Sequence, residues 1–261
     1  MTAFVLALDT ATEHCSLALG ARTGDRVAVL ASSDFDAPRA ALSRLLPAAV
    51  ELLAEAGHDI GEVAEVVVGR GPGSFTGVRI GVSSAKGIAH GLGAPLFGVG
   101  TLDAIAWRHV GHEGLLGVVG DAMRGEVYPA LFEISGGHVR RVSEDRVMKP
   151  GEAAAAWRAL DAPVLLAGNG LRKHGEIFAE VLGAAATQAD EELWTPSGEG
   201  LLAAYAEACA QGARGEGDAG SLLPIYTRLS DAEEAETDRL SGSSSNSLPQ
   251  SGVAGPEGER P

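Results

Sequence analysis

Residues 4–19, FVLALDTATEHCSLAL, hold two short apolar runs separated by a polar turn that begins at Asp9. Apolar runs of this length between turn-forming residues are typical of buried β-strands. Residues 4–8 and 15–19 are therefore predicted strands. A second turn at residues 20–25 leads into a third predicted strand at residues 27–31.

The rest of the first half is predicted to alternate helices with strands. The predicted helices span residues 38–56, 75–90 and 101–110, and the strands span residues 66–68 and 95–99. Thr101 is expected to cap the third helix, and Pro47 is expected to kink the first. The apolar residues of the first helix recur at helical spacing: Leu42, Leu45, Leu46, Val50 and Leu53.

The second half repeats this order. Residues 115–119, 127–134, 139–147 and 164–167 are predicted strands, and residues 151–160, 173–182 and 197–210 are predicted helices. Strands joined by a crossover helix pair in parallel, so each half of the chain is predicted to form a mixed sheet covered by helices. The repeated β-β-β-α-β-α order predicts a duplicated ribonuclease-H-like α/β fold, as in actin, Hsp70 and sugar kinases. Two unrelated α/β lobes are the alternative.

The predicted organisation is two lobes and a tail. Residues 1–110 form the first lobe and residues 111–228 the second, whose last helix can pack back on the first lobe. Residues 229–261 are a predicted disordered tail, because residues 231–261 hold seven acids, two arginines and almost no bulky apolar side chains.

Composition excludes several classes of protein. A net charge of −15 with three lysines and no basic stripe argues against binding nucleic acid unaided. Two cysteines without a CxxC spacing indicate reduced thiols rather than a disulfide framework. We find neither a signal peptide nor an apolar stretch of membrane-spanning length, and we therefore expect a cytoplasmic protein with no membrane partner.

The glycine-rich string at residues 69–81, GRGPGSFTGVRIG, joins a predicted strand to a predicted helix. It is neither a P-loop nor a dinucleotide fingerprint, since both motif spacings are absent. The following helix carries a seam of small residues: Gly77, Gly81, Ser84, Gly87 and Gly91. Interior helical glycines are unfavourable by about 1 kcal/mol each relative to alanine. The seam therefore fits either tight packing within the chain or docking against a partner.

A polar stripe on the same helix consists of Arg79, Ser83, Lys86 and His90. We predict that Gly77, Arg79, Gly81, Ser84, Lys86 and Gly87 belong to a partner interface. No HExxH motif exists, and His109, His112 and Glu113 are interpreted as loop residues rather than metal ligands.

Two acidic turns follow the first strand of each half, at residues 9–12 (DTAT) and 121–124 (DAMR). In a duplicated nucleotide-binding fold these turns face each other, hydroxyls hold phosphates, and an aspartate orients hydrated magnesium. If a nucleotide binds, Asp9, Thr10, Thr12 and Asp121 are its predicted ligands. Asp and Thr are also ordinary turn formers.

The chain resembles the TsaB family of tRNA threonylcarbamoyladenosine biosynthesis proteins. The resemblance covers residues 3–234 and includes both acidic turns, the glycine-rich string and residues 224–228, PIYTR. It implies an actin-like fold and a non-catalytic scaffold that pairs with TsaD, a larger paralogue that carries the metal. TsaD transfers threonylcarbamoyl to the adenosine beside the anticodon in tRNAs that read codons beginning with A.

The resemblance further implies that a TsaE-type ATPase docks on the heterodimer and that tRNA is reached only through the complex. We expect no catalytic residues, no metal and no cofactor in this chain, with ATP and Mg²⁺ acting at the level of the complex. The free chain is expected as a monomer or a homodimer. In one departure from the family, no histidine precedes Leu45-Leu46-Pro47, so no role for that histidine carries over.

Two other functions remain open from the sequence. An ATP-dependent phosphotransferase or ATPase would use Asp9, Thr10 and Asp121. An actin-like assembly protein would form filaments, for which the sequence gives no indication.

Overall fold

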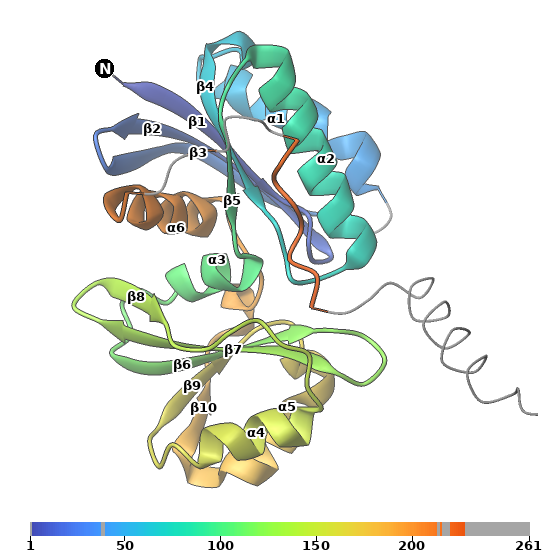
Figure 1. Ribbon diagram of the computed structural model, residues 1–261, viewed down its shortest axis with the longest axis vertical. Helices are drawn as coiled ribbons and strands as arrows, with labels where there is room; N and C mark the ends of the chain where they lie inside the picture. The colour runs from blue at the N-terminus through green and yellow to red at the C-terminus, as the bar shows by residue number, and fades with distance from the viewer. Residues whose placement is uncertain (1, 38–39, 213–214, 216–219, 228–261) are drawn as a thin grey trace, which may run out of the picture. The chain divides into compact units, whose positions relative to one another are not determined.

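The computed structural model describes residues 2–37, 40–212, 215 and 220–227, which contain two five-stranded mixed sheets (Figure 1). The first sheet has the order β3-β2-β1-β4-β5. Its strands are β1 (Ala3–Asp9), β2 (His14–Thr23), β3 (Arg26–Asp36), β4 (Val63–Gly69) and β5 (Leu96–Val99). The first three form an antiparallel meander, whereas β4 runs parallel to β1 and β5 parallel to β4.

The second sheet repeats this plan in the order β10-β9-β6-β7-β8. Its strands are β6 (Gly114–Asp121), β7 (Val127–Ser135), β8 (His138–Arg141), β9 (Val164–Ala167) and β10 (Ala186–Gln188). Again an antiparallel meander is extended by parallel strands on the other side of its first strand. The duplicated actin-like fold predicted from the sequence is therefore confirmed.

Two strands differ from the prediction. The predicted strand at residues 139–147 ends at Arg141, whose guanidinium pairs with Asp103 at 2.7 Å and also with Asp145 as the chain leaves the sheet. The strand β10 was not predicted, because its three residues have no apolar run and it is defined only by pairing with β9.

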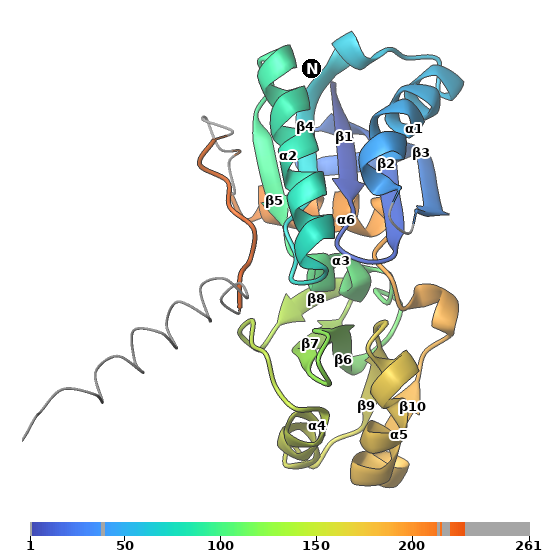
Figure 2. The same ribbon diagram turned by 90° about the vertical axis from the view of Figure 1, so that its right-hand side faces the viewer.

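Helices α1 (Ala41–Glu55) and α2 (Phe75–Leu92) lie side by side on one face of the first sheet (Figure 2). Pro47 lies inside α1, which continues through it to Glu55. The core between these helices and the sheet includes Leu6, Leu8, Leu52 and Val82. One face of each helix is thereby fixed against the sheet.

Helices α3 (Thr101–Trp107) and α6 (Gly198–Ala210) pack against each other, and α6 contacts all five strands of the first sheet. A buried polar cluster fixes this position: Glu65 of β4 accepts hydrogen bonds from Arg22 of β2, with Nε at 2.8 Å, and from the hydroxyl of Tyr205 on α6. Although α6 comes late in the sequence, it covers the first sheet.

The second sheet packs with α4 (Pro150–Arg158) and α5 (Leu171–Leu182), and its core also includes Leu102 and Ile105 of α3. Short 3₁₀ turns complete the elements: Ile60–Glu62, Gly183–Ala185 and Glu191–Leu193. We call the first sheet with α1, α2 and α6 the first lobe, and the second sheet with α4 and α5 the second lobe.

The tail predicted to be disordered, residues 229–261, lies outside the described residues. Within the described parts of the chain, every helix is too short or too polar to cross a membrane.

Candidate functional site

Asp9, at the end of β1, is completely buried and both of its carboxylate oxygens are engaged. Oδ1 accepts a hydrogen bond from the backbone N–H of Ala11 at 2.6 Å, and Oδ2 accepts one from the hydroxyl of Thr101 at 2.7 Å. The Thr101 oxygen accepts in turn from the N–H of Gly71 at 3.1 Å. Only glycine fits at position 69, because the Cβ of any other residue would overlap the Asp9 carboxylate.

Burial raises the pKa of Asp9 to about 6, although the hydrogen bonds from Ala11 and Thr101 oppose the shift. This geometry also corrects the predicted helix cap. Thr101 is the first residue of α3 and not its N-cap, which is Gly100, because the Thr101 hydroxyl is bound to Asp9. Asp9 thus ties the glycine-rich loop and α3 to the first strand.

Thr10 is buried as well, and its hydroxyl donates to the carbonyl of Gly77 at 2.6 Å. A Cβ on Gly77 would overlap the carbonyl oxygen of Thr10, and one on Gly81 would lie 2.6 Å from its Oγ1. The prediction that Gly77 and Gly81 face a partner is therefore corrected. Their small size lets α2 approach the chain's own turn, whereas a Cβ on Gly87 or Gly91 would meet no other part of the described residues within 4 Å.

The other two predicted nucleotide ligands also make contacts within the chain. Thr12 is half-buried, and its Oγ1 accepts from the N–H of His14 at 3.2 Å. Asp121 Oδ1 accepts from the N–H of Met123 at 2.9 Å, and Oδ2 pairs with Lys173. Because Asp9 and Thr10 have almost no exposed surface, the four side chains do not form an open phosphate cradle as they lie. Nucleotide binding stays a prediction.

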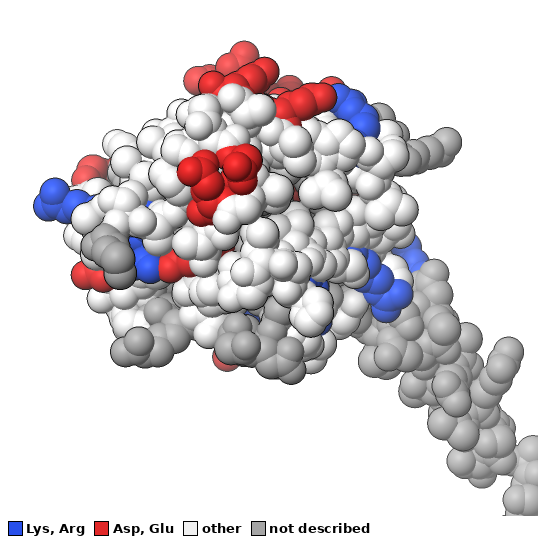
Figure 3. Space-filling model, turned by 90° about the horizontal axis from the view of Figure 1, so that it is seen from above, with Lys and Arg blue, Asp and Glu red and all other residues white. Residues whose placement is uncertain are grey.

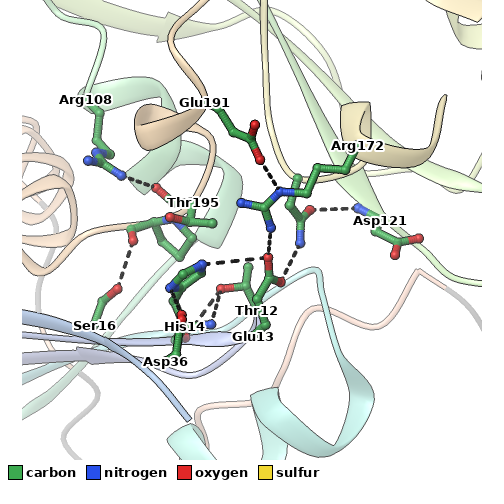
Figure 4. Close-up of polar contacts among 12 residues, drawn as sticks. Thr12, Glu13, His14, Ser16, Asp36, Arg108, Asp121, Arg172, Glu191 and Thr195 are labelled. Atoms are coloured by element: carbon green, nitrogen blue, oxygen red, sulfur yellow. Dashed lines mark hydrogen bonds and ion pairs between the residues drawn. The ribbon is translucent and has the colours of Figure 1, made fainter. Parts of the chain in front are cut away.

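A row of polar contacts joins the two lobes beside these turns (Figure 4). Glu13 accepts a hydrogen bond from Asn169 Nδ2 at 3.1 Å and pairs with Arg172, which also donates to Glu191 at 2.7 Å. Asn169 accepts from the N–H of Asp121 at 3.0 Å. The first turn thus reaches the second lobe through Glu13. Sequence analysis missed these residues, since no motif spacing links them.

Two residues of the predicted polar stripe on α2, Arg79 and Lys86, are bound by residues 220–227, which we call the strap; Figures 1 and 2 show it in orange beside α2. Arg79 stacks on the Phe75 ring at 3.7 Å, and its Nε donates to the Tyr226 hydroxyl at 3.1 Å. Lys86 Nζ donates to the carbonyl of Gly220 at 2.9 Å. Ser84 is half-buried and Gly87 is exposed.

An apolar stripe on α1 is exposed: Leu42, Leu46 and Val50. These residues follow one another at a spacing of four, so they share one flank of the helix. Arg44, on the opposite flank, stacks on Phe35 of β3, which places the stripe towards α2. The sequence analysis grouped five apolar residues of α1 on one helical face, but of these five only Leu45 and Leu53 are in the core, which also includes Leu52.

Among the residues that the structure describes, no group of three or more His, Cys, Asp or Glu side chains is arranged to hold a metal ion. His109 is buried, and burial lowers its pKa, but no cluster of metal ligands forms around it.

Comparison with known proteins places the chain in a family. A family model described as "TsaD: tRNA N6-adenosine threonylcarbamoyltransferase" matches residues 36–235. The tRNA threonylcarbamoyladenosine biosynthesis protein TsaB of Bacillus subtilis is 32% identical over 73% of this chain and 80% of its own length. Its counterpart from Escherichia coli is 32% identical over 80% of this chain and 88% of its own length.

Solved structures agree with this assignment. YeaZ from Pseudomonas aeruginosa superimposes with a TM-score of 0.71 at 33% identity, covering 86% of this chain and 99% of its own. A second structure from that organism, described as an uncharacterized protein with similarity to peptidase YEAZ, gives a TM-score of 0.73 at 33% identity, covering 87% of this chain and all of its own. The chain therefore belongs to the TsaB family.

Proposed function

We propose that this chain takes part in tRNA threonylcarbamoyladenosine biosynthesis as a non-catalytic scaffold that pairs with a TsaD-type paralogue. The names of its relatives in two bacteria support the pathway, and the match to the TsaD family model supports kinship with the partner. As part of the same proposal, a TsaE-type ATPase docks on the pair, tRNA is reached only through the complex, and the setting is the cytoplasm.

The observation that carries the proposal is the exposed surface formed by α1 and α2. Leu42, Leu46 and Val50 form an apolar stripe next to α2, on which Gly87 and Gly91 present open backbone. We call these five residues the docking face. An apolar stripe beside small residues suits a partner helix, because its side chains can approach the α2 backbone closely.

The charge distribution agrees with a protein contact there. Seen from above, the first lobe has large uncharged areas, and its acidic side chains gather in a few clusters (Figure 3). The whole chain carries −15 charges, yet α2 contains no acidic residue. Interface cores are depleted of charged residues, and none of the five residues of the docking face is charged. When the chain is alone, the docking face can also pair two copies.

The chemistry of the acidic turns favours this scaffold over the rival phosphotransferase. Asp9 and Thr10 are buried, and their polar atoms hold the glycine-rich loop and α2 in place. A phosphotransferase would need such groups at the substrate. In the proposed complex the chain therefore supplies a surface and no cofactor of its own, while ATP and Mg²⁺ act elsewhere in the assembly.

The test is pairing with the TsaD paralogue from the same organism. Leu46→Asp places a charge in the docking face at a side chain that is 50% exposed, and Leu160→Asp is its control at 44% exposure in the second lobe. We expect Leu46→Asp to abolish co-purification and Leu160→Asp to retain it, with both variants as stable as the parent chain. Full pairing by a folded Leu46→Asp variant would refute the proposed face.

The rival is tested in parallel by calorimetry with ATP and Mg²⁺ on the purified chain. We expect no binding at micromolar concentrations. Micromolar affinity that is lost in Asp9→Ala would instead support the phosphotransferase.

A further inference from the structure

The strap, residues 220–227, is fixed to the first lobe at several points along its length. Leu222 is buried in the core beneath α2. The N–H of Ile225 donates to the carbonyl of Arg70 at 2.7 Å, and Gly220 and Tyr226 bind Lys86 and Arg79. Together, these contacts hold the strap along the flank of α2 that faces away from α1.

The strap exposes apolar side chains between and beside these anchors. Leu223 is 63% exposed although its neighbour Leu222 is buried, and Tyr226 is half exposed. The Tyr226 ring lies 5.9 Å from that of Phe75, which is also exposed, and Arg79 stacks on Phe75. Exposed Tyr, Phe and Arg side chains packed together are the composition enriched in the core of protein interfaces.

The two apolar surfaces flank α2 on opposite sides. The stripe of α1 lies on one side, and Leu223 with the Phe75–Arg79–Tyr226 stack lies on the other. Between them α2 presents small residues such as Ser83 and Gly87, both exposed. A partner that rests on α2 therefore meets apolar side chains on both flanks.

On the α2 and strap parts of this surface the charge has one sign; the carboxylates of α1, Glu51 and Glu55, lie outside the stripe of Leu42, Leu46 and Val50. Neither α2 nor the strap contains a carboxylate, whereas α2 carries Arg79, Lys86 and His90. Arg79 and Lys86 form no salt bridge with a carboxylate of the described residues; they bind a ring, a hydroxyl and a carbonyl. In a chain of −15 charges, this favours a partner whose contacting surface is apolar with acidic residues at its edge.

We propose that the strap completes the docking face, so that the partner subunit binds a three-part surface of α1, α2 and the strap. The partner contributes an apolar helical surface bordered by carboxylates, which lie against Arg79 and Lys86. This inference rests on the proposed function, because it extends the face through which the chain would pair.

The test compares three variants of the full chain in titrations with the purified TsaD paralogue. Leu223→Asp changes a mostly exposed side chain of the strap, Leu46→Asp changes the α1 stripe, and Leu160→Asp is the distant control. We expect Leu223→Asp to weaken pairing at least tenfold and the control to change it less than twofold, with all three variants folded by circular dichroism. Raising the salt concentration should weaken pairing of the parent chain, because ion pairs at the edge are screened.

The outcomes separate the two proposals. If Leu46→Asp abolishes pairing and Leu223→Asp leaves it unchanged, the docking face stands and the role of the strap is overturned. If neither variant affects pairing, the docking face itself is wrong. If the partner pairs equally well at low and high salt, the proposed contact between its carboxylates and Arg79 and Lys86 is wrong.

Discussion

The buried carboxylate of Asp9 makes the stability of this chain depend on pH in a defined direction. Its pKa is raised from 3.8 to about 6 in the folded chain because burial disfavours the charged form. The folded chain therefore holds a proton more tightly than the unfolded chain. The stability that this group contributes is fully present below pH 3.8 and is lost as the pH rises through 6.

The matched perturbation is Asp9→Asn, which keeps the size of the side chain and cannot ionise. Its amide oxygen can still accept from the N–H of Ala11. Its NH₂ group can donate to the hydroxyl oxygen of Thr101, which reverses one hydrogen bond. The variant should fold, and its stability should lack the proton-linked component.

The size of the effect follows from linkage. One pKa unit corresponds to about 1.4 kcal/mol. Between pH 8 and pH 5 the folded chain takes up most of one proton at Asp9, whereas the unfolded chain takes up almost none. The free energy of unfolding of the parent chain, relative to Asp9→Asn, should therefore rise by about 1.4 kcal/mol over this interval.

Guanidinium unfolding monitored by tryptophan fluorescence at pH 8, 7, 6 and 5 measures this difference. Asp25→Asn, in the exposed turn between β2 and β3, controls for removing one negative charge from an acidic chain. A difference between parent and Asp9→Asn that stays constant across these pH values, or that falls as the pH falls, would refute the argument that burial raises the Asp9 pKa.

Three further substitutions test the packing on the first lobe by thermal or chemical unfolding. Gly77→Ala should destabilise the chain by about 1–3 kcal/mol, because its Cβ would overlap the backbone of Thr10; an unchanged midpoint would contradict this packing. Gly87→Ala, in open space on the same helix, should instead stabilise the isolated chain by up to about 1 kcal/mol. Glu65→Ala should lower the free energy of unfolding by about 3–5 kcal/mol, because Arg22 loses its carboxylate and the buried Tyr205 hydroxyl loses its acceptor; a loss below 1 kcal/mol would show that water replaces the carboxylate.

The sequence by itself determined the order and type of nearly every element. Apolar runs of strand length, helical spacing and glycine-rich turns are local patterns, so they predicted both meanders and both sets of crossovers. Repetition of that order then fixed the fold class. The exceptions are places without a local pattern: β10 exists only through pairing with β9, and β8 ends where Arg141 turns to Asp103 and Asp145.

Tertiary structure alone decided what the individual side chains do. A glycine seam has the same sequence whether it meets a partner or the chain's own turn, and only the approach of Thr10 separates Gly77 and Gly81 from Gly87. Likewise, an aspartate after a strand becomes a buried anchor only because Thr101, more than ninety residues later, donates to it. Contacts between distant residues depend on how the elements pack, and spacing along the chain does not encode that packing.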